Sequence, residues 1–315
     1  MPFHLIKDKT HINFLGATRR KIALGLSAVV IIGSIASLFV KGLAFGIDFT
    51  GGILLEVGYE QPANLESIRN KLAEDGFEDA QVQLFGSDTD VLVRLSPQEG
   101  ADPDALREEL RSIVAAGTSG VDLRRVEFVS PQVGGELTER GGLAMIIALL
   151  LIFVYVMIRF QWKFAAGAVA ALVHDVIITV GFFSLLQLPF DLTVVAAVLA
   201  VIGYSLNDTV VAFDRIRENF FKLRGVEPDV SMNTSINEML ARTLITGLTT
   251  LLVLVALLVF GGESIAPFSI ALIVGIIVGT YSSIYTASAT ALLLGVNAQD
   301  LIEPVKDPDL IDDLP

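Results

Sequence analysis

Three places in the sequence put ionisable side chains inside or beside long apolar stretches. His174 and Asp175 fall in one stretch, Asp208 follows Asn207 in the next, and Arg242 stands beside a third. Insertion scales assign a free-energy cost of about 2.5–3.5 kcal/mol to Asp, Lys or Arg at the centre of a membrane helix. Such residues are therefore functional candidates. A carboxylate, an imidazole and a guanidinium in that setting can take up, hold and pass on protons.

The apolar stretches that hold these groups are long enough to cross a membrane. The chain has 315 residues, of which 53% are hydrophobic and 18% charged, which is more apolar than a usual soluble protein. Six runs are found, at about Ile22–Val40, Leu143–Ile158, Phe164–Leu188, Leu192–Phe213, Leu244–Phe260 and Ile265–Leu294. The first exceeds a signal-peptide core and no convincing cleavage site follows it, so we expect it to be retained. We predict a multi-pass α-helical membrane protein with six transmembrane helices.

The distribution of lysine and arginine indicates which loops lie on the cytoplasmic side of the membrane. Basic residues gather before the first run, in the 159–163 loop and across residues 214–243, whereas the loops 189–191 and 261–264 hold none. Both termini are therefore predicted to be cytoplasmic. The chain is expected to divide into a cytoplasmic N-terminus with the first helix (1–42), an external domain (43–138), helices two to six (139–297) and an acidic cytoplasmic tail (298–315).

The external segment between the first two helices carries most of the net charge of −13. Its apolar residues read as strand, helix, strand, strand, helix, strand, with a second helix starting after Asp102 and ending at Gly117. This βαββαβ order predicts a ferredoxin-like α+β domain. No catalytic constellation is evident in it, and the acidity argues against nucleic acid as a partner.

Depth along the helices relates the ionisable groups to one another. At about 1.5 Å per residue, His174 and Asp175 lie near the midplane, while Asp208 and Arg242 lie at similar depth in the cytoplasmic half. That match permits an ion pair, and a carboxylate that moves away from its cation could bind a proton, so the pair is a candidate proton gate. Alternatively, Arg242 ends its helix and reaches the cytoplasmic surface.

Other polar and small residues in the spans could serve in helix packing. His174 and Asp175 could be a relay step, a packing hydrogen bond or both. Asp214 is expected to be an exposed partner of nearby basic residues, such as Arg215 or Arg217. Hydroxyls in the spans could extend a hydrogen-bonded path but are more often packing groups. A stripe of small residues on the last span indicates close helix contacts in this chain or with another. These positions are Tyr204, Ser205, Thr243 and Thr246 for the hydroxyls and Gly275, Gly279, Ser283 and Ala287 for the stripe.

One motif is far more specific than the rest. The segment Gly46-Ile47-Asp48-Phe49-Thr50-Gly51-Gly52 resembles the GIDFTGG motif of the SecF family of preprotein translocase subunits. Blocks around Asn207-Asp208, Arg242 and His174-Asp175 are similar too, in the same order and across essentially the whole chain. The resemblance implies one half of a resistance-nodulation-division transporter, located in the cytoplasmic (inner) membrane of a bacterium.

The resemblance also implies partners and residue roles. SecD would supply the other six spans, and the pair would associate with the SecYEG channel, with SecA at the channel and YajC and YidC nearby, to draw preproteins across by proton flow. Asp208 and Arg242 match the family's residues for proton passage. The Gly46, Asp48, Thr50, Gly51 and Gly52 segment resembles a hinge between helix and external domain; a carboxylate capping a turn is the rival account of Asp48. No cofactor or metal is implied, and lipids surround the helices.

Two other function classes were weighed against this one. A half-transporter for lipids or drugs, from the same superfamily, would need an apolar or aromatic cleft in the external domain. An intramembrane aspartyl protease would need Asp175 and Asp208 as a close dyad, but their depths differ. The leading expectation is a proton-driven transport subunit and not an enzyme.

Overall fold

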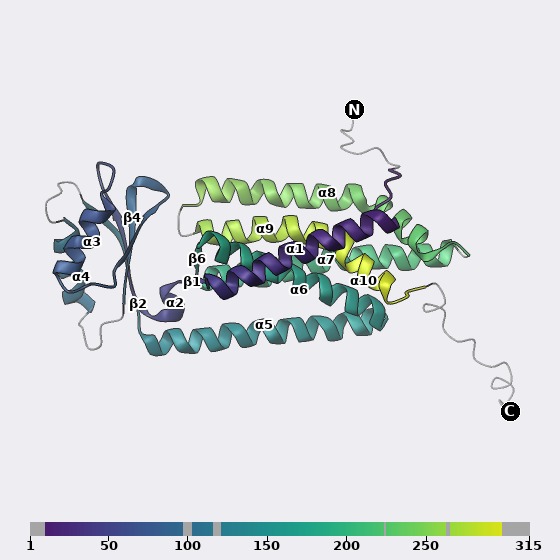
Figure 1. Cartoon of the computed structure of the whole chain (residues 1–315), viewed down its shortest axis with the longest axis horizontal. Coiled ribbons are helices and arrows are strands. Elements are labelled where there is room, and N and C mark those ends of the chain that lie inside the picture. Colours follow the sequence, from purple (N-terminus) through teal and green to yellow (C-terminus); the bar gives the residue numbers. More distant parts are fainter. Residues whose placement is uncertain (1–9, 97–102, 116–120, 224, 263–264, 298–315) are drawn as a thin grey trace, which may run out of the picture.

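A bundle of long helices and a small sheet domain lie end to end in the computed structural model, which describes residues 10–96, 103–115, 121–223, 225–262 and 265–297 (Figure 1). In this described part, six spans are long and apolar enough to cross a membrane. The spans are α1 (Ala17–Val40), α5 (Pro131–Arg159), α6 (Trp162–Leu186), α7 (Leu192–Lys222), α8 (Pro228–Phe260) and a last one through α9 (Ala266–Ser282), η2 (Ser283–Ala287) and α10 (Ser288–Leu293). The prediction of a six-helix membrane protein is confirmed.

Two of these helices begin earlier than the apolar runs indicate. Helix α5 starts at Pro131, where the Ser130 hydroxyl accepts a hydrogen bond from the Val133 amide, and α8 starts at Pro228. Proline is favoured at the first helical position because the amide hydrogen it lacks has no partner there. The polar first turns of both helices carry no hydropathy signal, which is why the sequence placed these starts too late.

Some sequence expectations lie outside the described residues. These are the acidic tail 298–315 and the start and stop residues Asp102 and Gly117 of the second sheet-domain helix.

The sheet domain follows a short connection from α1. Its elements are β2 (Gly52–Gly58), α3 (Leu65–Glu74), β3 (Gln81–Phe85), β4 (Ser87–Leu95), α4 (Pro103–Ala115) and β5 (Asp122–Val129), in the expected sequence of strands and helices. The sheet has the order β3-β4-β2-β5, and each neighbouring pair is antiparallel.

One face of this sheet forms a hydrophobic core with the two helices. Alternate residues of β2 and β4 point to that face, as the pleat of a strand requires, and the helices meet them with residues spaced by one turn. The fully buried members include Leu55, Val57, Leu72, Val91, Val93 and Leu110. Helix α3 begins at the Asn64 cap, whose side chain accepts a hydrogen bond from the Ser67 amide.

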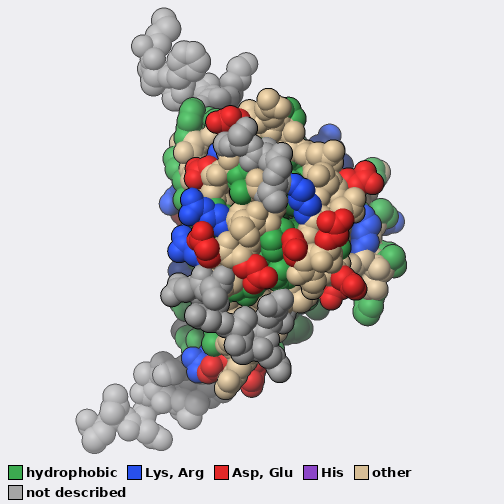
Figure 2. Space-filling model, turned by 90° about the vertical axis from the view of Figure 1, so that its left-hand side faces the viewer, with side chains coloured by type: hydrophobic (Ala, Val, Ile, Leu, Met, Phe, Trp, Pro, Cys, Tyr) green, Lys and Arg blue, Asp and Glu red, His purple; other side chains and the backbone are tan. Residues whose placement is uncertain are grey.

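The opposite face of the sheet is turned toward the helix bundle, while α3 and α4 lie on the far side (Figure 1). Seen from that far end, acidic and basic side chains are scattered among other residues (Figure 2). Between the sheet and the bundle is a cavity of about 290 Å³, lined by Leu54, Glu56 and Arg94 of the sheet and by Asp191 at the start of α7. Burial lowers the pKa of the Arg94 guanidinium, and the negative charge of Asp191 opposes that shift.

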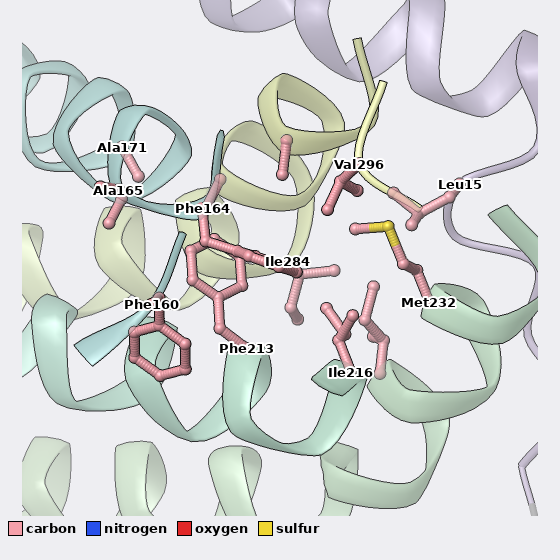
Figure 3. Packing of buried hydrophobic residues seen from close by; sticks show 14 of the residues in the cluster. Leu15, Phe160, Phe164, Ala165, Ala171, Phe213, Ile216, Met232, Ile284 and Val296 are labelled. Carbon is pink, nitrogen blue, oxygen red and sulfur yellow. The ribbon is translucent and has the colours of Figure 1, made fainter. Parts of the chain in front are cut away.

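The helix bundle is closed at its other end by aromatic and aliphatic packing. Phe164 of α6 and Phe213 of α7 are fully buried, with ring centroids 4.9 Å apart, and Met232 of α8 packs in the same cluster (Figure 3). The chain ahead of α1 is fastened there, because Leu15 is buried in the cluster and the Phe14 amide donates to Asn233 Oδ1 at 2.6 Å.

The ionisation of the Tyr59 phenol provides a test of the sheet-domain core. Burial raises its pKa to about 12 from about 10, so the neutral phenol favours the folded state. Its contribution to stability is present below pH 10 and is lost as the pH rises through about 12. We expect the difference in tyrosinate absorbance between the native chain and Tyr59→Phe to appear near pH 12. A midpoint near pH 10 would contradict the buried phenol.

Candidate functional site

The ionisable pair on α6 is buried at the centre of the bundle. Asp175 has 0% exposed surface and His174 has 2%. Asp175 Oδ1 lies 2.9 Å from His174 Nδ1, and Asp175 Oδ2 accepts hydrogen bonds from Ser205 of α7 at 2.6 Å and from Ser282 of α9 at 2.8 Å. A buried carboxylate requires such partners, because removal from water is costly without them.

The histidine extends this cluster to the first span. His174 Nε2 lies 3.1 Å from Ser27 Oγ of α1, and the ring stacks on Tyr281 of α9 with centroids 6.2 Å apart. Tyr281 in turn donates to the Ala23 carbonyl of α1 at 2.8 Å. The pair is therefore a packing element that links four helices, α1, α6, α7 and α9; its part in a relay stays a prediction. We call these six residues the His174 network: Ser27, His174, Asp175, Ser205, Tyr281 and Ser282.

Small residues allow the helices around this network to approach closely. A Cβ added at Gly275 would lie 2.1 Å from Val201 Cγ2, and one at Gly279 would lie 3.1 Å from Ser205 Cβ and 3.5 Å from Asp175 Oδ2. The two glycines of the stripe predicted on the last span thus pack against α7 within this chain, while Ala287 lies against Gly167 of α6. Directly after Ser282, the helix widens into the π-helical turn η2, a feature often found at functional sites.

Asp208 lies on α7, three residues and almost one turn beyond Ser205. Its exposed surface is 5%, and its Oδ2 is buried without a hydrogen-bond partner among the described residues. No hydrogen bond joins Asp208 to Asp175, whose oxygens are occupied by His174 and two serines. Asp175 and Asp208 therefore do not form the hydrogen-bonded carboxylate pair that an aspartyl protease uses.

Arg242 lies on α8 and its side chain is exposed on the surface of the chain. The helix continues from Arg242 back to Pro228, so Arg242 does not end its helix. Within the described part of the chain, Asp208 and Arg242 form no ion pair within 4.0 Å. The two groups thus form no close ion pair, although the positive charge of Arg242 still acts on the Asp208 carboxylate.

The neighbouring polar residues serve different purposes. Asp214 is exposed and pairs with Arg159 of α5 at 2.7 Å, and not with Arg215, which pairs with Glu218 and Glu238. The Thr246 hydroxyl donates to the Arg242 carbonyl of its own helix at 3.0 Å. The expectation of an exposed, paired Asp214 is confirmed, with a partner from another helix. Asn207 is exposed, and the hydroxyl of Tyr204 is buried without a partner in the described chain.

The glycine-rich segment after α1 is held against the start of α7. Strand β1 (Ala44–Phe45) pairs in parallel with β6 (Pro189–Phe190), and the short helix α2 (Ile47–Thr50) follows. Asp48 Oδ2 accepts a hydrogen bond from the Leu192 amide at 3.0 Å, beside the Asp191 cap of the same helix. The capping account of Asp48 is confirmed, but the turn that it caps is the first turn of α7.

Glycine is required where this segment enters the sheet domain. Gly51 and Gly52 have φ angles of 70° and 122°, and a Cβ at Gly52 would lie 2.4 Å from the Leu95 carbonyl oxygen. Residues with a Cβ rarely adopt such angles. Thr50 supports the turn, because its hydroxyl donates to the Gly51 carbonyl at 2.9 Å.

Sequence reasoning missed three members of the His174 network: Ser27, Tyr281 and Ser282. A signal for Ser27 exists, since the buried residues of α1 are the small ones, Ala23, Ser27, Ser34 and Ser37. Small residues along one face of a span indicate a contact surface. No such pattern indicated which side chain Tyr281 or Ser282 would meet.

Six spans, a sheet domain after the first span and buried ionisable groups in the bundle define a multi-pass membrane protein with a domain beyond one end of the bundle. The family model described as protein export membrane protein SecD/SecF, C-terminal, matches residues 110–297, and the SecD/SecF GG motif matches residues 36–63. The second match contains the glycine-rich segment, and the first contains the His174 network apart from Ser27.

Comparison with individual relatives identifies the family more closely. The chain is 52% identical over 303 residues to the protein translocase subunit SecF of Vibrio alginolyticus, with 96% of each chain covered. It is 49% identical to the SecF subunit of Pseudomonas aeruginosa, covering 96% of this chain and 98% of the relative. The chain therefore belongs to the SecF family of protein translocase subunits, which are inner-membrane transport components of the Sec export system.

Two solved structures share the fold. The crystal structure of SecDF from Thermus thermophilus matches with a TM-score of 0.84 at 36% identity, covering 92% of this chain and 39% of that chain. A structure of SecDF in a super-membrane-facing form matches with a TM-score of 0.66 at 37% identity, covering 93% of this chain and 40% of that chain. This chain thus spans about two fifths of the solved SecDF chains.

Close packing of α9 on α7 is tested at Gly275. We expect Gly275→Ala to lower the stability of the bundle by about 1–3 kcal/mol, because the added methyl meets the stiff Val201 side chain. Thermal unfolding in detergent measures the change. Gly33→Ala on α1 is the matched control, since a Cβ there meets nothing within 4 Å. Equal melting temperatures for the two variants would contradict the close contact.

Proposed function

We propose that this chain works with a SecD partner and uses the proton-motive force to promote a late stage of protein translocation across the cytoplasmic membrane. The burial of the Asp208 carboxylate is the observation that supports the proposal most strongly. Its carboxylate is nearly buried in a membrane span, and one oxygen has no hydrogen-bond partner in the described chain. An ionisable group kept in such a place is a candidate for proton transfer.

The energy available matches a change of conformation. One elementary charge that crosses 100 mV is worth about 2.3 kcal/mol, which can shift an equilibrium between two states of a domain. The proton pathway that we propose uses Asp208 and Arg242, with Asn207, His174 and Asp175 nearby. The proton gradient is the energy source, and no resident cofactor is needed.

Charge supports a cytoplasmic location for both termini. The described chain begins and ends at the end of the bundle away from the sheet domain (Figure 1). Basic residues concentrate at that end, among them Arg19, Arg20, Lys21, Arg159, Lys163, Arg215, Arg217 and Lys222. The connection from α6 to α7 at the opposite end has no lysine or arginine. Under the positive-inside rule, the sheet domain is then external. Its strand order and its two helices on one face support a ferredoxin-like fold.

Exposed polar groups within the spans indicate where a partner covers the chain. Asn207 and Gly203 lie one turn apart on the exposed face of α7, and Arg242 and Thr246 do the same on α8. Lipid is a poor environment for an arginine or an asparagine, so a protein surface is favoured there. SecD is the proposed partner, since the solved SecDF chains are much longer than this one.

The remaining partners follow from the family. We propose association with the SecYEG channel, with SecA at the channel and YajC and YidC nearby, and a preprotein as the translocated cargo. The half-transporter alternative is not favoured, because the relatives are translocase subunits. The cavity under the sheet also has charged walls of both signs, including Glu56, Arg94 and Asp191, which suits neither a lipid nor a drug.

The segment around Gly46, Asp48, Thr50, Gly51 and Gly52 is the proposed hinge for the external domain. Two glycines with positive φ allow the chain to turn, while Asp48 fastens one side of the segment to α7. Movement of the domain would then occur between Gly51 and β2, where the sheet begins.

Proton transfer is tested with Asp208→Asn in proteoliposomes that contain SecD and the channel. We expect this variant to abolish the stimulation of translocation by a proton gradient, because an amide cannot take up the proton. Asp214→Asn is the matched control on the same helix, since Asp214 is exposed and paired with Arg159. Normal stimulation by the Asp208 variant, with normal insertion and SecD binding, would refute the proposed role.

The Asp48 contact is tested with spin labels, which the absence of native cysteine makes simple. Labels at Asn70→Cys and Leu186→Cys report the distance between the sheet domain and the bundle. We expect Asp48→Ala to broaden the distance distribution, while Asp48→Asn preserves it, because asparagine can still accept the Leu192 amide hydrogen. The same distribution in both variants would show that this contact does not position the domain.

A further inference from the structure

The hydrogen bonds of the His174 network determine which atoms carry hydrogen. Asp175 Oδ1 is an acceptor when the carboxylate is ionised, so the ring nitrogen beside it, His174 Nδ1, is the donor at 2.9 Å. A neutral ring then leaves Nε2 as an acceptor. The group next to Nε2 is the hydroxyl of Ser27, at 3.1 Å.

The Ser27 hydroxyl has one hydrogen and two acceptors within reach. One is His174 Nε2, and the other is the Tyr281 hydroxyl oxygen at 3.4 Å. Tyr281 does not compete for the role of donor, because its own hydrogen is directed to the Ala23 carbonyl at 2.8 Å. Rotation of a single hydroxyl therefore switches the Ser27 hydrogen between the ring and the tyrosine.

Both protonation states of the ring are satisfied by this arrangement. When His174 is neutral, Ser27 donates to Nε2. When the ring carries two protons, Nε2–H donates to the Ser27 oxygen, and the Ser27 hydrogen turns to Tyr281. In that second state the cationic ring lies beside the Asp175 carboxylate, whose other oxygen is held by Ser205 and Ser282. A buried ion pair is tolerated only when its remaining polar atoms are satisfied in this way.

We propose that Ser27 and Tyr281 are positioning residues that let His174 take up and release a proton at Nε2 inside the bundle. An N–H bond forms at Nε2 as an O–H bond of a hydrated proton breaks, which leaves water, and the Ser27 hydroxyl rotates as the proton arrives. The inference rests on the proposed proton-driven function and adds the first span to its path. Ser205 connects the network to α7, one turn from Asp208.

The ionisable groups around His174 come from each helix packed on it. Asp175 is its neighbour on α6, Tyr281 and Tyr285 lie on the last span, and Asp208 lies on α7. The ionisable residues of α1 lie in its first turns, and none follows Lys21 along the helix. Ser27 itself is neutral. If loss of its hydroxyl changes the pH dependence, the change therefore arises through the effect of Ser27 on these ionisable groups.

A spectroscopic test needs no transport assay. The sequence has three histidines, so His4→Gln with His11→Gln leaves His174 as the only imidazole. With ¹⁵N-histidine in lipid nanodiscs, we expect the neutral ring to carry its hydrogen on Nδ1. We expect Ser27→Ala to move the Nε2 resonance toward that of a nitrogen without a hydrogen bond, and Ser27→Thr to restore it. Tyr281→Phe should change the spectrum of the doubly protonated ring only.

Ser37→Ala is the matched control for this test. It removes a hydrogen bond between α1 and α6 of similar length, 2.9 Å to Ser184, without touching an imidazole. It should leave the His174 resonances unchanged. A neutral ring protonated at Nε2, or an Nε2 resonance that Ser27→Ala does not move, would overturn the proposal.

Proton-stimulated translocation separates this inference from the proposed function. We expect Ser27→Ala to lower the stimulation about three- to tenfold, the effect of one hydrogen bond on a rate, and to alter its pH profile. Ser27→Thr and Ser37→Ala should stay within about twofold of the native chain. If Asp208→Asn abolishes stimulation and Ser27→Ala leaves it unchanged, the inference fails and the proposed function stands. If neither variant has an effect, both fail.

Discussion

A carboxylate that is removed from water must be surrounded by donors, and the bundle is arranged around this requirement at Asp175. Hydroxyl donors come from α7 and α9, and the imidazole of His174 supplies a third polar contact. For the hydroxyls to reach the carboxylate, the helices must lie closer than ordinary side chains allow. Gly279 provides that space, since a Cβ there would already be 3.1 Å from Ser205. The small-residue stripe and the buried acid are thus two parts of one arrangement.

Asp175 and Asp208 show how position separates two carboxylates on neighbouring helices. Asp175 has every oxygen engaged, whereas Asp208, one turn from Ser205, has a buried oxygen with no partner in the described chain. The satisfied carboxylate holds helices together. The unsatisfied one lies near exposed polar groups, Asn207 on its own helix among them, on the side where another protein could approach. Under the proposed function, Asp208 takes up a proton directly, whereas Asp175 both links helices and lies beside the imidazole of His174, although both are aspartates in membrane spans.

Much of this could be predicted from the sequence, because long-range hydropathy and short-range alternation are local properties. The six spans, the strands and helices of the sheet domain and the position of Asp175 within a span follow from them. The starts of α5 and α8 do not, since their first turns are polar and only a proline marks them. The partners of His174 were also missed. Ser27 is 147 residues away and Ser282 is 107 residues from Asp175, and nothing in the spacing of one helix fixes its register against another.

Helix α7 has a mechanical consequence. It runs without interruption from Leu192, whose amide is held by Asp48, past Ser205 and Asp208 to Lys222. An α-helix of this length is stiff along its axis, because every turn is braced by backbone hydrogen bonds. A displacement of Asp208 along that axis would therefore move the helix start with it, at the point where Asp48 contacts α7. Under the proposed function, α7 is thus a stiff connection between Asp208 and the base of the sheet domain.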